Sequence, residues 1–119
     1  MRYMLLIYGD EKARSTMSEQ EGRSLFKQYG EFTDSIRQSG AFQAGDPLQP
    51  TSTATTVRMK NGKTVTTDGP FAETKEQLGG YYIVEAENLD DALGIASRIP
   101  SVRIGGAIEV RPIMELRPR

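Results

Sequence analysis

The chain opens on an apolar run, Met1–Tyr8, in which apolar side chains occupy both odd and even positions. This pattern is typical of a strand that is covered on both faces, and Gly9-Asp10 then interrupts it. A second run of the same kind, Leu78–Glu85, stays apolar until its last residue. We therefore expect two central strands of one sheet.

Two segments with apolar residues at three- and four-residue spacing predict helices. The first begins at Ser18, which forms a capping-box pattern with Glu21, and it ends at Gly40. The second begins near Asn88 and ends before Pro100. Their apolar stripes are Leu25, Tyr29, Phe32 and Ile36 in the first helix, and Leu89, Ala92, Leu93, Ala96 and Ile99 in the second.

A hairpin is predicted around Asn61-Gly62, because both residues tolerate the positive φ angles of a tight turn. Its strands, Thr53–Lys60 and Lys63–Thr67, are rich in threonine and valine. With a two-residue turn, one face of the hairpin carries Val57, Met59, Thr64 and Thr66, whereas the other carries Arg58, Lys60 and Val65. A bulge at Gly62 would shift this register.

Two shorter strands complete the order β-α-β-β-β-α-β: Ala41–Ala44, broken at Gly45-Asp46-Pro47, and a strand after Gly105-Gly106. The order favours a single domain, residues 1–119, of the α+β class. We expect a ferredoxin-like antiparallel sheet with two helices on one face. The second face would then need cover from another copy of the chain, which predicts a homodimer.

The composition excludes several kinds of site. The chain has no cysteine and no histidine, so Cys-ligated zinc, a Ser-His-Asp triad and His-ligated haem are ruled out. Gly79-Gly80 lacks the Lys-Ser/Thr and the helix of a phosphate loop and more resembles a bulge or a close backbone approach, so no cofactor is expected. Charges are scattered and sum to −1, without the basic stripe of direct nucleic-acid binders. The first apolar run is too short to span a membrane, and we expect a cytoplasmic protein.

The segment Asp68-Gly69-Pro70-Phe71 carries a family resemblance that extends along nearly the whole chain. The other matching segments are Tyr3–Tyr8, Ala54–Arg58, Thr67–Tyr82, Leu89–Leu93 and Ile108–Pro112. In these segments the sequence resembles the YCII-related family, in its DGPF-motif branch.

The resemblance implies a dimeric α/β-barrel, in which two ferredoxin-like sheets face each other. Genes of this branch often lie beside those of extracytoplasmic-function sigma factors. An enzymatic site built on a histidine–aspartate pair has been proposed for the wider group, some members act on chlorinated aromatic intermediates, and fold neighbours include muconolactone isomerases and cofactor-free monooxygenases. Because this chain has no histidine, that pair cannot form here.

Asp68 is the candidate catalytic residue. A carboxylate at a strand end beside Pro70 and Phe71 can be partly desolvated, which would raise its pKa toward a range useful for acid–base work. The alternative is turn chemistry, in which the Asp68 side chain bonds backbone amides and Gly69 supplies the permissive φ.

Candidate ligand-binding residues surround this motif. Arg58 could clamp a substrate carboxylate through two hydrogen bonds, and Glu73 and Lys75 add charges nearby. The alternative is an ion-pair network of Arg58 or Lys75 with the acidic residues that pins the loop to the sheet. The carboxylates match no metal-loop spacing, so no metal is expected.

Aromatic side chains could line a small apolar pocket, with Phe71 and Tyr82 as candidate ligand contacts. Tyr81 and Tyr82 point to opposite faces of their strand, so only one of them can face any given pocket.

Two functional hypotheses follow from these residues. The first is a small-molecule-binding protein or a cofactor-independent enzyme of the isomerase or lyase kind, with Asp68 as acid–base group and Arg58 as anion clamp. The second is a regulatory or interaction module linked to a sigma-factor system. A cavity that reaches both residues would favour the first, and a filled interior with an exposed apolar surface would favour the second.

Overall fold

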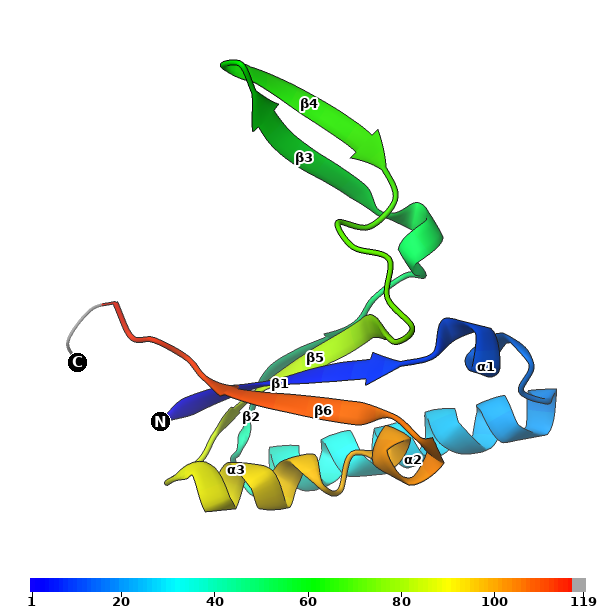
Figure 1. The fold of residues 1–119 in the computed structure, drawn as a ribbon. Coiled ribbons are helices and arrows are strands. Elements are labelled where there is room, and N and C mark those ends of the chain that lie inside the picture. Colours follow the sequence, from blue (N-terminus) through cyan, green and yellow to red (C-terminus); the bar gives the residue numbers. More distant parts are fainter. Residues whose placement is uncertain (117–119) are drawn as a thin grey trace.

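A computed structural model describes residues 1–116 (Figure 1). Its strands are β1 (Arg2–Gly9), β2 (Phe42–Pro47), β3 (Thr55–Lys60), β4 (Lys63–Asp68), β5 (Gln77–Glu85) and β6 (Ala107–Pro112). Its helices are α1 (Glu11–Ser15), α2 (Glu19–Gln38) and α3 (Leu89–Ala96), with two 3₁₀ turns, Thr51–Thr53 and Pro100–Ile104. The predicted α+β class is confirmed.

Four strands form the main sheet, in the order β2-β5-β1-β6, and each neighbouring pair is antiparallel. The two apolar runs of the sequence, β1 and β5, occupy its centre as expected. Leu5 of β1 lies between Tyr82 of β5 and Val110 of β6. Alternate residues of β1 are buried, and the residues between them stay partly exposed. The sheet therefore has one covered face and one open face.

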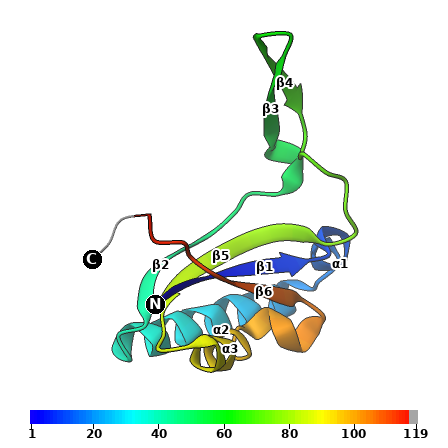
Figure 2. The same cartoon turned by 60° about the vertical axis from the view of Figure 1, so that its left-hand side comes forward.

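Helices α2 and α3 lie against the covered face, as Figures 1 and 2 show. The capping box at Ser18 and Glu21 is present at the start of α2, and Gly40 follows its end with a φ of +83°. The buried core joins β1, β5, α2 and α3 and contains Tyr3, Leu5, Ile7, Phe32, Ile36, Tyr82, Val84, Ala86, Ala92, Ile95, Ala96 and Ile99. The stripe predicted for α3 and the residues just after it is partly wrong: Ala92, Ala96 and Ile99 are buried as expected, but Leu89 and Leu93 are exposed and Ile95 is buried in their place.

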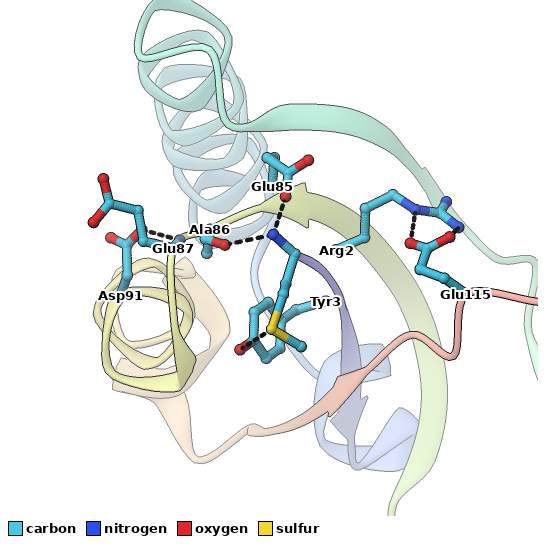
Figure 3. A network of polar contacts seen from close by, with 8 residues as sticks. Arg2, Tyr3, Glu85, Ala86, Glu87, Asp91 and Glu115 are labelled. Atoms are coloured by element: carbon cyan, nitrogen blue, oxygen red, sulfur yellow. Dashed lines mark hydrogen bonds and ion pairs between the residues drawn. The ribbon is translucent and has the colours of Figure 1, made fainter. Parts of the chain in front are cut away.

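The N-terminus is fixed against the end of β5 (Figure 3). The Met1 amino group donates a hydrogen bond to the Ala86 carbonyl at 3.0 Å and lies 2.5 Å from a Glu85 carboxylate oxygen. Beside it, the Arg2 guanidinium binds the Glu115 carboxylate through two hydrogen bonds of 2.9 and 3.2 Å. These contacts hold Met1 at the end of β5 and Glu115 beside the start of β1.

Strands β3 and β4 form a separate two-stranded ribbon, which we call the arm (Thr55–Asp68). The sequence predicted one sheet, and this prediction is wrong: the arm projects away from the main sheet (Figure 1). The turn itself is confirmed, with φ of 51° at Asn61 and 76° at Gly62 and Lys60 directly opposite Lys63. The two-residue register places Val57 and Met59 on one face and Arg58 on the other, as predicted.

Three local features differ from expectation or refine it. Strand β2 continues through Gly45-Asp46-Pro47, where a break was predicted, because these residues pair with β5. The short helix α1 was not predicted. The sequence predicted either a bulge or a close backbone approach at Gly79-Gly80, and both are present. The β1–β5 register shifts at this point, and a Cβ on Gly80 would lie 3.1 Å from the Asp46 carbonyl oxygen.

Gly45 provides a test of how tightly β2 packs on the core. A Cβ there would lie 2.5 Å from Cδ1 of Tyr82, whose ring is held by Phe32 and by a hydrogen bond to Thr33. Gly45→Ala should therefore lower the free energy of unfolding by about 1–3 kcal/mol, the usual cost of overpacking. Urea denaturation measures this change.

Gly94 is the matched control, because it is an exposed helical glycine with no atom near the position of an added Cβ. Gly94→Ala should raise the free energy of unfolding by about 0.5–1 kcal/mol, since alanine loses less backbone entropy in a helix. If both variants unfold at the same urea midpoint as the parent, the close packing of Gly45 under Tyr82 is not a constraint on the fold.

Candidate functional site

Asp68 ends β4 at the base of the arm, and its side chain is exposed. The turn that follows is made by its neighbours. Gly69 adopts a φ of +102°, its N–H donates to the Ala54 carbonyl at 2.8 Å, and its own carbonyl accepts from the Thr56 hydroxyl at 2.9 Å. Within residues 1–116 the Asp68 carboxylate makes no hydrogen bond or ion pair. It is a solvent-facing carboxylate beside a closed turn.

Arg58, midway along the arm, contacts Phe71 of the segment that follows it. The Arg58 guanidinium carbon lies 4.9 Å from the centroid of the Phe71 ring, which is the geometry of a cation–π contact. Phe71 is nevertheless 74% exposed. In the described part of the chain, neither Arg58 nor Glu73 forms an ion pair, so the charge network considered as an alternative is not formed there. The contact attaches the segment after β4 to the arm.

Lys75 lies elsewhere, on the wall of a cavity of about 970 Å³ at one end of the main sheet. The cavity is framed by the end of β1, by α1, by the segment 48–52, by the start of β5 and by the 3₁₀ turn after α3. Its volume is at the upper end of the range of about 300–1,000 Å³ in which small molecules bind.

Helix α1 is fixed in this wall by hydrogen bonds from its first residues. The Asp10 carboxylate caps the helix by accepting from the Lys12 amide at 2.9 Å. The Glu11 carboxylate accepts from the Thr51 amide at 2.9 Å and from the Thr51 hydroxyl at 2.5 Å. The Glu11 amide in turn donates to Oε1 of Gln77 at 2.9 Å. The Glu11 carboxylate thus joins α1 to the segment before the arm, and the Glu11 amide joins α1 to β5.

The charged groups of the cavity wall differ in whether they have partners. Three carboxylates accept hydrogen bonds from backbone amides: those of Asp10, Glu11 and Glu21. The amide of Ser18 and its hydroxyl hold the pKa of the Glu21 carboxyl below its usual range, so Glu21 stays ionised. The cations of the wall, Lys12, Arg14 and Lys75, have no ion-pair partner among residues 1–116.

Arg14 occupies a special position, because it lines both the larger cavity and a second one of about 710 Å³. Its guanidinium lies over the bulge in β5: a Cβ on Gly79 would be 3.6 Å from Nη1. The missing side chain at this position leaves space for the guanidinium beside the sheet. Arg14 is therefore the cation best placed to meet an anionic ligand in either cavity.

The second cavity lies between α2, β2 and β5 and includes Tyr82. The Tyr82 hydroxyl shares a hydrogen bond of 2.7 Å with the Thr33 hydroxyl. The Tyr82 ring meets Phe32 and Phe42 edge-on, at centroid distances of 5.3 and 6.3 Å. Burial raises the pKa of Tyr82 above its ordinary value, so the phenol is neutral at physiological pH.

Tyr81 lies on the open face, as the alternation predicted. Its hydroxyl donates to the Asp46 carboxylate at 2.8 Å, and this bond raises the pKa of the Tyr81 phenol. Both tyrosines nevertheless line the second cavity, so the expectation that only one of them could face a given pocket is wrong.

A family model of the YCII-related domain matches residues 1–117. The chain belongs to the YCII-related family. It is also 35% identical, over 99% of its length and 96% of the relative's, to an uncharacterised protein of Rhizobium meliloti (strain 1021).

In this YCII-related domain the candidate residues fall into separate places. Asp68 ends the arm at its base, and Arg58 lies midway along the arm on the opposite face, against Phe71. Lys75 borders the larger cavity and Tyr82 the smaller one. Glu73 is exposed on the segment that follows the arm. Neither cavity includes Asp68 or Arg58.

Sequence reasoning missed Arg14 and Glu11 because it treated Gly9-Asp10 only as the end of a strand. The usable signal was Asp10 itself: an aspartate followed by helix-forming residues is a common N-cap. It would have predicted α1, although not its position against Gln77.

No group of three or more histidine, cysteine, aspartate or glutamate side chains in residues 1–116 is arranged to hold a metal ion. No helix in the same part of the chain is long and apolar enough to cross a membrane.

Tyr82→Phe tests the buried hydroxyl pair. At about pH 8 the variant should unfold with a free energy lower by about 1 kcal/mol, because Thr33 loses a hydrogen-bond partner. The raised pKa means that the unfolded chain releases the phenol proton at lower pH than the folded one, so this contribution declines above pH ~10. Urea midpoints at about pH 8 and pH 11 should show the gap between parent and variant narrowing; a gap that widens would contradict the assignment.

Proposed function

We propose that this YCII-related domain is a homodimer that binds a small anionic molecule in the larger cavity, without a cofactor. The observation that carries the proposal is the cavity wall itself. Its carboxylates at Asp10, Glu11 and Glu21 accept hydrogen bonds from backbone amides, whereas Arg14 and Lys75 have no ion-pair partner in residues 1–116. A ligand carboxylate or phosphate would supply the missing acceptor for the cations.

The dimer is proposed to form through the open face of the main sheet. Met4, Leu6, Tyr8 and Ile83 lie on that face and remain partly exposed. Two copies with these faces together would form a dimeric α/β-barrel, which we propose as the assembly. The strand order β2-β5-β1-β6, with the arm set aside, supports a ferredoxin-like unit for it.

The Asp68-Gly69-Pro70-Phe71 segment supports placing the chain in the DGPF-motif branch. Isomerase or lyase chemistry would need Asp68 as the acid–base group and Arg58 as the anion clamp. Since the two residues lie on opposite faces of the arm and outside both cavities, this chemistry would require one ligand to reach both faces of the arm. Binding is therefore the simpler proposal.

A second candidate function is a regulatory or interaction module, associated with a sigma-factor system. The observation that favours it is the exposed apolar face of the arm, where Val57 and Met59 are 64% and 70% exposed. Large exposed apolar side chains that gather on one element commonly mark a contact surface for another macromolecule.

Arg14→Gln is the test of the binding proposal. Thermal unfolding of the parent is recorded with a panel of small mono- and dicarboxylates and inorganic phosphate. A ligand at one hundred times its dissociation constant should stabilise the fold by about 2.7 kcal/mol. Arg14→Gln should abolish that stabilisation, because glutamine keeps much of the side chain's length but has no charge.

Arg23→Gln is the control for Arg14→Gln. Arg23 is exposed on α2, pairs with Glu19 at 3.3 Å and lines neither cavity, so this variant should respond like the parent. An unchanged ligand response in Arg14→Gln would remove the larger cavity as the binding site.

Asp68→Asn separates catalysis from turn formation. Asparagine has nearly the same shape but cannot ionise. Because the carboxylate is exposed and unbonded within residues 1–116, the free energy of unfolding should change by no more than about 0.5 kcal/mol. If Asp68 is an acid–base group, activity on any substrate found in the panel is lost while stability holds. Retained activity would eliminate the catalytic role.

A further inference from the structure

The arm is exposed on both faces. Every residue of β4 is exposed, and in β3 Thr56 alone is partly covered. Val57 and Met59 share one face with Thr66 and Thr64, which lie directly opposite them. An isolated two-stranded ribbon is at best marginally stable in water, because it has no apolar surface to bury. The arm therefore needs a surface against which to pack.

The direction of the arm limits which surface that can be. Figures 1 and 2 show α2 and α3 on one side of the main sheet and the arm rising from the other side. The arm thus stands on the side of the open face, where Met4, Leu6 and Tyr8 are partly exposed. A body that covered the open face would lie alongside the arm.

Charge gives a second, independent indication of the partner. The arm carries three cations, Arg58, Lys60 and Lys63, and one acidic residue, Asp68 at its end. Removing this net +2 from the chain's net charge of −1 leaves −3 on the remainder of the chain. Two of those acids, Asp46 and Glu109, lie on β2 and β6, the outer strands of the open face. The arm is complementary in charge to the body of its own chain.

We propose that the arm clasps a second copy of this chain docked on the open face, with Val57 and Met59 packed against the partner's body. The proposal rests on the homodimer proposed above and extends it. Under two-fold symmetry each copy offers one arm and one body, so the same pair of surfaces is buried twice. The cations lie on the face of the arm opposite Val57 and Met59, so their attraction to the acidic body of the other copy acts over a distance, where it speeds association and is screened by salt.

The test is the dimer dissociation constant of Val57→Thr/Met59→Thr, measured by sedimentation. Threonine keeps the preference for strand structure but removes the apolar contact. We expect the constant to rise at least about tenfold, equivalent to about 1.4 kcal/mol. Val65→Thr is the matched control, because Val65 lies on the opposite face of the arm, beside Arg58, and should leave the constant unchanged.

Hydrogen exchange of the arm amides supplies a readout on the unmodified chain. Amides 55–68 should be protected at concentrations above the dissociation constant and lose protection below it, and added salt should weaken the dimer. Protection that is the same at all concentrations, in a chain that sediments as a dimer, would overturn the proposal, because the arm would then be stabilised within its own subunit.

The outcomes distinguish failure of the clasp from failure of the dimer. A parent that is a monomer at all concentrations overturns the dimer and the clasp together. A dimer whose dissociation constant is the same in parent, double variant and control overturns the clasp alone, and leaves the arm as a surface for a different macromolecule.

Discussion

The fold depends on one constraint. The central strands β1 and β5 are apolar on both faces of the sheet, and the helices of residues 1–116 cover only one of these faces. Leu5 and Val84 are completely buried under α2 and α3. Met4 and Ile83, one position away and directly opposite each other, belong to the face that no helix covers. Burial of apolar surface is the dominant stabilising term in folding and in most protein association, so the same strands that build the core also favour docking.

The cavities arise where the regular packing of this sheet is interrupted. The bulge at Gly79 shifts the pairing of β5 with β1, and Arg14 lies in the space that a side chain would fill. The adjoining wall is fixed by Glu11, which bonds Thr51 through its carboxylate and Gln77 through its amide. A wall fixed by hydrogen bonds, whose cations have no ion-pair partner in residues 1–116, favours binding, because less ordering cost remains when a ligand arrives.

Features decided by neighbouring residues could be predicted from the sequence. The capping box at Ser18 and the turn at Asn61-Gly62 depend only on local hydrogen bonds and φ preferences, and both are present. The central position of β1 and β5 also followed from their composition. The cap and the turn were predictable because each is determined by residues within three or four positions of one another.

Features that depend on distant contacts could not be predicted. Nothing in the threonine-rich segment of the arm distinguishes a strand inside a sheet from a strand in a free ribbon, because both need the same propensities. Likewise Arg58 and Asp68 are close enough in sequence to suggest a shared site, yet the guanidinium lies over Phe71 and both residues lie outside the two cavities. The position of Lys75 on the larger cavity depends on where α1 lies, which the sequence did not indicate.

The arm also has a consequence for aggregation. A ribbon of two strands has an unpaired edge along each of its strands, and such edges can recruit strands from other molecules and start aggregation. Arg58, Lys60 and Lys63 place a charge on both strands and on both sides of the turn. Stacking one arm on another would bring these like charges together. Newly made chains are therefore protected against edge-to-edge aggregation by the same three side chains.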